Sequence, residues 1–246
     1  MHGVELSNGT NGRREAPADV DGELYRMFLE HGGGDINKWH HYFAIYERHF
    51  ARFRGTPVSL LEIGVERGGS LGLWRRYFGE AARITGIDID ADCKRHAAPG
   101  IEVLIGDQES PPFLKAANDS RGPFDIVIDD GGHTTRQQLV SYETLFPLLR
   151  DGGVYLVEDV HTSMWPWFVD PDLGISFLDV ATRQAEKLTW WHRDPMSFLR
   201  YGKPPAEREG PLDVPDITRR TFSIAFYDSV VVFEKQAVPE PRREVR

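Results

Sequence analysis

Five short apolar segments, separated by longer amphipathic stretches, constrain the fold more than any other feature of this chain. They span residues 58–64, 83–88, 101–105, 124–129 and 154–157. Nearly continuous runs of Val, Ile and Leu are typical of strands that are buried on both faces of a parallel sheet. The stretches between them are long enough for crossover helices. The pattern therefore predicts an α/β domain with helices on both faces of a mostly parallel sheet.

The C-terminal part of the chain adds two further apolar segments. Residues 222–226 and 230–234 are joined by a tight connection, which predicts an antiparallel hairpin. A parallel sheet that closes with an antiparallel strand is typical of Rossmann-like class I methyltransferases, whereas hydride-transferring dinucleotide enzymes usually keep the last strand parallel. We therefore expect a seven-stranded sheet of the methyltransferase type.

The length of 246 residues suits one such domain with a single buried core. We expect a mobile tail over residues 1–20, the domain over 21–236 and a C-terminal tail over 237–246. Residues 170–216 contain tryptophans and several prolines, and they are expected to form an insertion that is part helix and part lid.

The charge balance argues against nucleic acid as a partner. The chain carries 29 basic and 38 acidic side chains, a net charge of −9, whereas proteins that bind nucleic acid usually present a basic face to the phosphates. No segment approaches the roughly 18 apolar residues that would span a bilayer. We therefore expect a cytoplasmic protein without a membrane partner.

A glycine-rich turn follows the first apolar segment. The sequence from Glu62 to Ser70 reads E-I-G-V-E-R-G-G-S. Glycines let the backbone approach a ligand, and the N-terminus of the next helix offers free N–H groups to an anion. The spacing is not that of a dinucleotide fingerprint; it is similar to motif I of S-adenosylmethionine (SAM) methyltransferases, in which the anion is the methionine carboxylate. Glu62, Gly64, Gly68 and Ser70 are therefore predicted to form part of a SAM site.

Two further strand ends carry polar residues suited to the same ligand. Asp88 closes the second segment, where an acid accepts hydrogen bonds from ribose hydroxyls, and Asp107 and Gln108 follow the third, where the adenine would lie. Glu62 and Asp88 could instead be solvated carboxylates at the ends of strands. Because the signals occur at three successive strand ends, we favour the SAM site and include Asp129 and Tyr42 in it.

Acidic residues also follow the fourth and fifth segments. D-D-G-G-H ends at His133, and the fifth segment leads into Glu158 and Asp159. Because the carboxyl ends of neighbouring parallel strands meet in one crevice, Asp130, Glu158 and Asp159 should converge. Carboxylates this close repel one another unless a cation lies between them, and oxygen ligands favour Mg²⁺ or another hard divalent ion. These three residues are the predicted metal ligands.

The histidine of the same motif is the predicted general base. A neutral imidazole three residues after Asp130 could accept the proton of a hydroxyl that the metal orients, and the oxygen could then attack the sulfonium methyl group. The catalytic pair is thus His133 with Asp130. The alternatives are that Asp129 and Asp130 merely begin a loop, that His133 caps the following helix with its ring in solvent, and that Glu158 and Asp159 are surface acids of a net-negative protein.

Taken together, these motifs resemble the magnesium-dependent deoxysugar O-methyltransferases of macrolide and related antibiotic pathways, including rhamnosyl O-methyltransferases. The matching stretches are 38–42, 61–65, 68–71, 86–89, 106–108, 128–133, 158–159 and 226–227. The resemblance implies SAM and Mg²⁺ as cofactors, a glycosylated small-molecule acceptor and a homo-oligomer. It also implies that Asp130, Glu158 and Asp159 bind the metal and that His133 is the base.

Three other functions stay open at this point. A catechol-type O-methyltransferase shares the metal chemistry but takes a flat phenolic acceptor. A SAM-binding module without catalysis would bind the cofactor and transfer no methyl group. A hydride-transfer enzyme would prefer NAD to SAM, and the C-terminal hairpin argues against it.

Overall fold

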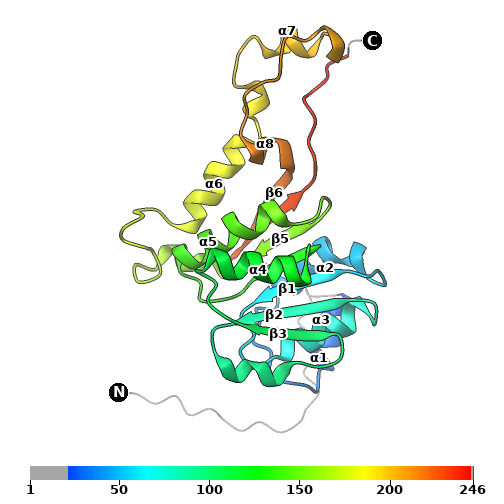
Figure 1. Ribbon diagram of the computed structural model, residues 1–246, viewed down its shortest axis with the longest axis vertical. Helices are drawn as coiled ribbons and strands as arrows, with labels where there is room; N and C mark the ends of the chain where they lie inside the picture. The colour runs from blue at the N-terminus through cyan, green and yellow to red at the C-terminus, as the bar shows by residue number, and fades with distance from the viewer. Residues whose placement is uncertain (1–21, 245) are drawn as a thin grey trace.

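The computed structural model describes residues 22–244 and 246 (Figure 1). The tail expected over residues 1–20 lies outside the described residues. Among the described residues, no helix has the length and apolar character needed to cross a membrane.

One sheet organises the molecule, with the strand order β3-β2-β1-β4-β5-β7-β6. The strands are β1 (Ser59–Ile63), β2 (Arg83–Asp88), β3 (Ile101–Ile105), β4 (Ile126–Asp129), β5 (Val154–Val157), β6 (Thr221–Tyr227) and β7 (Val230–Lys235). The first five pair in parallel, whereas β7 runs antiparallel to both β5 and β6. The predicted seven-stranded sheet with an antiparallel end is confirmed. Its strand order reverses between β1 and β4, where ligands bind in open α/β sheets.

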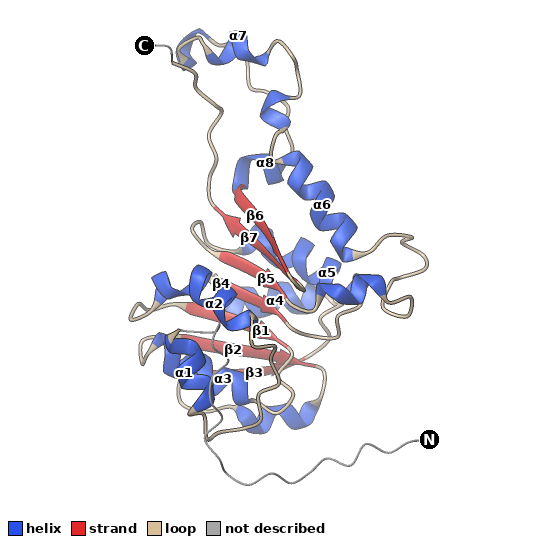
Figure 2. Cartoon of the chain, turned by 180° about the vertical axis from the view of Figure 1, so that it is seen from behind, coloured by secondary structure: helices blue, strands red, loops and turns tan. Residues whose placement is uncertain are grey.

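Helices cover both faces of this sheet (Figures 1 and 2). They are α1 (Glu23–Leu29), α2 (Tyr42–Phe50), α3 (Gly69–Phe78), α4 (Pro111–Arg121), α5 (Thr135–Leu145), α6 (Phe177–Lys187), α7 (Ser197–Tyr201) and α8 (Asp216–Arg220). Apolar residues of α1, α2 and α3 pack in one core, and those of α4, α5 and α6 pack in the other.

The strands contribute alternate side chains to these two cores. Leu60 and Ile126 belong to the core with α2 and α3, whereas their neighbours Leu61 and Val127 belong to the core with α4 and α5. All four side chains are essentially inaccessible to solvent. Because successive side chains of a strand point to opposite faces, a sheet covered on both sides requires apolar residues at every position. This requirement explains the continuous apolar runs in the sequence.

The insertion expected over residues 170–216 forms α6, α7 and the start of α8. The start of α6 packs in the core, and the part around α7 projects away from the sheet (Figure 2). The C-terminal residues, expected to form a tail, run along it. The Arg200 Nε lies 2.5 Å from an oxygen of Glu240, and the backbone N–H of Arg243 donates to the carbonyl of Tyr201 over 2.8 Å. The insertion is thus held by the end of the chain.

Candidate active site

A cavity of about 550 Å³ lies at the carboxyl ends of β1 to β4. Eight of the predicted site residues line it, namely Gly64, Ser70, Asp88, Asp107, Gln108, Asp130, His133 and Asp159. The other five, Tyr42, Glu62, Gly68, Asp129 and Glu158, do not belong to its lining. No described residue of the 170–216 insertion lines it either; residues 35–38 border it instead. The role of the insertion as a lid stays a prediction.

The turn after β1 passes very close to the turn after β4. Gly64 has a φ of +94°, and a Cβ atom at this position would lie 2.0 Å from the backbone oxygen of Asp130. Only glycine avoids both the backbone strain and the collision. The glycine therefore brings the cofactor turn and the acidic turn of β4 into contact.

Glu62 lies behind this turn and is fully buried. One carboxylate oxygen accepts a hydrogen bond of 2.8 Å from the Ser70 hydroxyl, at the start of α3. Burial raises the pKa of Glu62 to about 7. Its observed contacts are thus with the protein: it holds the first turn of α3 against the end of β1.

Asp88, at the end of β2, is held by backbone donors. The N–H groups of Val65 and Glu66 donate to one oxygen over 2.8 and 3.0 Å, and the N–H of Asp90 donates to the other over 2.9 Å. Partial burial opposes ionisation, but these backbone hydrogen bonds outweigh it and lower the pKa of Asp88. The cavity therefore presents a firmly oriented carboxylate at this strand end.

Gln108 connects three elements around the cavity. Its amide nitrogen lies 3.2 Å from both Asp129 Oδ1 and the Ser141 hydroxyl, and its carbonyl oxygen accepts from the N–H of Gly132 over 2.9 Å. Asp129 is fully buried behind these groups, and burial raises its pKa to about 7. Asp129 thus supports the turn that carries the adjacent Asp130 rather than facing the cavity.

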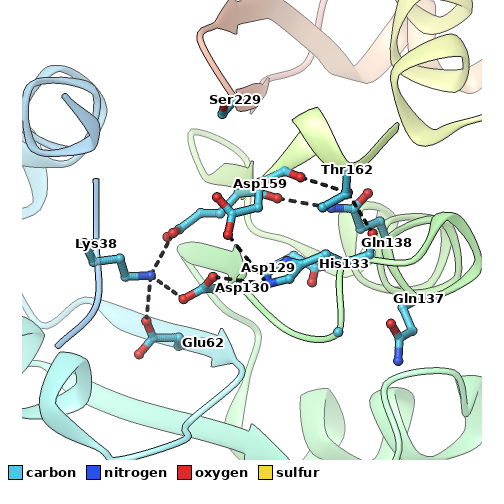
Figure 3. Close-up of polar contacts among 12 residues, drawn as sticks. Lys38, Glu62, Asp129, Asp130, His133, Gln137, Gln138, Asp159, Thr162 and Ser229 are labelled. Carbon is cyan, nitrogen blue, oxygen red and sulfur yellow. Dashed lines mark hydrogen bonds and ion pairs between the residues drawn. The ribbon is translucent and has the colours of Figure 1, made fainter. Parts of the chain in front are cut away.

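Asp130, His133 and Asp159 converge at one side of the cavity (Figure 3). Each offers one ligand atom, and these atoms all lie within 4.8 Å of one another. The His133 Nε2 is 3.9 Å from Asp130 Oδ1 and 3.6 Å from Asp159 Oδ2. Two carboxylate oxygens at these separations fit a divalent cation, and the His133 imidazole lies beside them.

The backbone of this group is strained. His133 and Asp159 have φ values of +59° and +53°, a region that residues other than glycine seldom occupy and that recurs at functional sites. The Thr162 hydroxyl lies 3.0 Å from the carbonyl oxygen of His133 and 2.9 Å from that of Asp159. This one side chain bonds to the backbone at both strained positions.

Glu158 has a different environment from its neighbour Asp159. It is fully buried, and it accepts hydrogen bonds of 2.6 Å from the Tyr46 hydroxyl and 2.7 Å from the Lys38 ammonium, one on each oxygen. Burial and the nearby charge of Asp130 raise the pKa of Glu158 to about 8. It does not belong to the convergent group, so its role as a metal ligand stays a prediction.

Lys38 is the main component that the sequence motifs did not reveal. Its ammonium forms a short contact with Asp130 Oδ2, binds Glu158 and lies 4.0 Å from Glu62 (Figure 3). Burial favours the neutral amine, but the three carboxylates prevail and raise the pKa of Lys38. Lys38 lies in the matched stretch 38–42, which is the one sequence signal that could have drawn attention to it.

Tyr42 was predicted to contact the cofactor, but its side chain has another partner in this structure. Its hydroxyl donates to Asp159 Oδ1 over 2.5 Å. The first turn of α2 directs the ring toward the end of β5, away from the cavity lining. Cofactor contact by Tyr42 stays a prediction.

Sequence comparison identifies the central part of the chain. Residues 61–160 match the family model described as a methyltransferase domain. This part of the chain is therefore similar to methyltransferase domains, in agreement with the strand order and the position of the cavity.

Individual relatives show which methyltransferases the chain is similar to. Over 159 residues the chain is 45% identical to the 8-demethyl-8-alpha-L-rhamnosyl tetracenomycin-C 2'-O-methyltransferase of Streptomyces olivaceus, covering 61% of this chain and 40% of that protein. It is 40% identical to the demethylmacrocin O-methyltransferase of Streptomyces fradiae, covering 63% and 40%. The resemblance to deoxysugar O-methyltransferases is thus confirmed, although the chain spans only about two fifths of the length of these relatives.

A solved structure agrees with this assignment. The methyltransferase MycE from the mycinamycin biosynthetic pathway, in complex with Mg, SAH and mycinamycin VI, matches with a TM-score of 0.74 and 28% identity. The match covers 91% of this chain and 56% of MycE. Almost the whole described fold therefore has a counterpart in that enzyme.

Proposed function

We propose that this protein transfers the methyl group of SAM to a hydroxyl of a deoxysugar on a glycosylated natural product. The observation that carries the proposal is the convergence of Asp130, His133 and Asp159 on the cavity at the switch point of a methyltransferase sheet. The names of the relatives, which methylate rhamnosyl and macrolide substrates, support the acceptor class.

The glycine turn and Asp88 would hold SAM. The N-terminus of α3 follows Gly68, whose φ of +74° marks the left-handed start of the helix; it offers N–H groups to the methionine carboxylate. Asp88 would accept hydrogen bonds from the ribose hydroxyls, because its oriented, ionised oxygens line the cavity. The adenine would lie beside Asp107 and Gln108 at the end of β3.

Asp130 and Asp159 would hold the metal ion. Their oxygens nearest His133, Oδ1 of Asp130 and Oδ2 of Asp159, are available on the cavity side. A bound Mg²⁺ would lower the pKa of an acceptor hydroxyl and fix its direction. Two adjacent sugar hydroxyls offer the kind of oxygen donors that such an ion prefers.

His133 would take the proton of the acceptor hydroxyl at Nε2. The acceptor oxygen then forms a bond to the methyl carbon while the bond from that carbon to the sulfonium sulfur breaks. S-Adenosylhomocysteine leaves as a neutral thioether, and the proton stays on the imidazole until solvent removes it. Alignment of oxygen, carbon and sulfur in the crevice supplies much of the expected rate.

The proposal is tested by following transfer of a labelled methyl group from SAM to a rhamnosylated aromatic polyketide, with and without Mg²⁺. Turnover that EDTA abolishes and Mg²⁺ restores is expected. A catechol supplied as a rival acceptor tests the phenolic alternative. If that alternative is correct, the catechol should be methylated faster than the glycoside. Binding of SAM without transfer to either acceptor would leave the protein as a SAM-binding module. Homo-oligomeric assembly and cytoplasmic location stay predictions.

A further inference from the structure

Three side chains in and just before α2 contact all three acids of the predicted metal site. Lys38 lies in the non-helical segment before the turn that leads into α2, Tyr42 begins α2, and Tyr46 lies one turn further along. Tyr42 and Tyr46 are four residues apart and project from the same side of the helix, and Lys38 reaches the same acids from the segment that precedes it. We propose that this Lys38–Tyr42–Tyr46 row positions the metal-binding carboxylates, an inference that rests on the proposed function.

The row binds one carboxylate oxygen of each aspartate and leaves the other oxygen facing His133. Lys38 binds Asp130 at Oδ2, which leaves Oδ1 on the side of His133 at 3.9 Å. In the same way Tyr42 donates to Asp159 at Oδ1, which leaves Oδ2 at 3.6 Å from His133. Each aspartate is therefore fixed through its outer oxygen while its inner oxygen faces the convergence point. Groups that bond to metal ligands in this way fix their orientation and typically contribute 10- to 100-fold to metal affinity.

Glu158 is the one of the three acids that the row binds through both carboxylate oxygens. Tyr46 and Lys38 together occupy both of its oxygens. Because the Lys38 ammonium touches Asp130 as well, it reduces the repulsion between two carboxylates in a buried site. The row thus keeps Glu158 beside the site and leaves the inner oxygens of Asp130 and Asp159 free.

The contacts could instead serve only to stabilise the fold. Tyr46 is fully buried and packs edge-on against Trp74, with ring centroids 5.1 Å apart. Tyr77 provides a matched control, because its hydroxyl donates over 2.8 Å to Glu47 on α2, which is not one of the predicted metal-site acids. A purely structural role predicts similar consequences for Tyr42→Phe and Tyr77→Phe.

The test is the affinity of the full chain for Mn²⁺, measured by electron paramagnetic resonance without SAM or acceptor. Tyr42→Phe should weaken Mn²⁺ binding by about tenfold and Lys38→Met by up to about 100-fold, whereas Tyr77→Phe should bind as the wild type does. Thermal unfolding of each variant shows whether it is folded. Lys38→Arg, which keeps the charge, should recover part of the lost affinity.

Two other outcomes would overturn the positioning proposal and the metal-dependent function, respectively. If the wild type binds Mn²⁺ and Tyr42→Phe binds it equally well, or Lys38→Met binds it more tightly, the row does not position the ligands and the proposal is wrong. Tighter binding would mean that Lys38 competes with the metal for Asp130. If the wild type binds no Mn²⁺ at millimolar concentration, the metal-dependent function fails as well.

Discussion

The two ends of the crevice are built in different ways. At the cofactor end, backbone groups fix the geometry: Gly64 contacts the turn of Asp130, and the N–H groups of Val65 and Glu66 hold Asp88. At the metal end, side chains from distant parts of the chain do so, since Lys38 and Tyr42 bind acids about 90 to 120 residues away. The first end is thus set by local chain geometry and the second by long-range packing.

This difference has a consequence for substitutions. A change in the glycine turn alters backbone that both ends share, because the turns after β1 and β4 touch. A change of a side chain at the metal end leaves that backbone in place. We therefore expect substitutions of side chains at the metal end to leave SAM binding intact. A substitution in the glycine turn should impair both ends.

The largest effect is expected at His133. His133→Ala should lower kcat by roughly two to four orders of magnitude, because the acceptor proton loses its base. The affinity for SAM, measured by calorimetry, should change little, because the substitution leaves the glycine turn and Asp88 intact. An unchanged kcat would remove His133 from the mechanism, and a lost SAM affinity would show that the two ends are not separable.

Gly64→Ala should damage both ends together. The added Cβ would meet the Asp130 carbonyl at 2.0 Å with φ at +94°, so the two turns must move apart. We expect a loss of about 3 kcal/mol in the free energy of unfolding, at the upper end of ordinary substitutions, and weaker binding of both SAM and Mn²⁺.

Gly79→Ala is the matched control for this prediction. Gly79 has a similar φ of +91°, but nothing lies within 4 Å of its added Cβ. Gly79→Ala should cost only the strain of a positive-φ backbone that essentially glycine alone adopts, about 1–3 kcal/mol, and leave both ligands bound. Equal losses for the two variants would show that the contact between the turns is unimportant.

The fully buried acids and the backbone-bound Asp88 should respond to pH in opposite directions. Burial raises the pKa of Asp129 to about 7 and, with the charge of Asp130, that of Glu158 to about 8. The stability that these protonated acids contribute is lost as the pH rises through those values, because the unfolded chain ionises near pH 4. The lowered pKa of Asp88 has the reverse effect, since its contribution is lost as the pH falls.

Thermal unfolding of the metal-free protein between pH 5 and 9 measures the contribution of the buried acids, because Asp88 titrates below this range. The unfolding temperature should fall from pH 5 to about pH 8, and Asp129→Asn should reduce the fall, because it removes roughly 2 kcal/mol of the cost of ionising a buried acid. An Asp129→Asn variant with the same pH dependence as the wild type would mean that other groups cause the fall.

Residues at the ends of the strands could be predicted from the sequence better than the side chains that reach them from elsewhere, because the former depend on local patterns and the latter on long-range packing. The fold and the positions of Gly64 and Asp88 follow from short-range patterns, namely apolar runs and the residues at their ends. Lys38 could not be assigned in this way, because its partners Asp130 and Glu158 become neighbours only after the sheet and α2 pack together. The same packing gives Tyr42 a protein partner instead of the cofactor contact that its position suggested.

The smallest expected effect concerns the acceptor, beyond the metal end. Trp167 is 76% exposed and packs beside Trp165, with ring centroids 6.3 Å apart. Trp165 in turn contacts His161, whose Nδ1 lies 3.9 Å from Asp159 Oδ1. Exposed indole rings that connect to the metal end in this way suit the flat aglycone of a glycoside whose sugar reaches His133.

Trp167→Ala should therefore raise KM for a rhamnosylated aromatic polyketide by about three- to tenfold, the loss of one aromatic contact, with kcat nearly unchanged. A simple methyl rhamnoside, which has no aglycone to stack, should show no such change. Phe222, 61% exposed on the edge strand β6, supplies the control variant Phe222→Ala, which should leave both substrates unaffected. Equal KM changes for the two substrates would mean that Trp167 contacts the sugar or supports the metal site itself. The metal end would then include residues beyond those that contact Asp159.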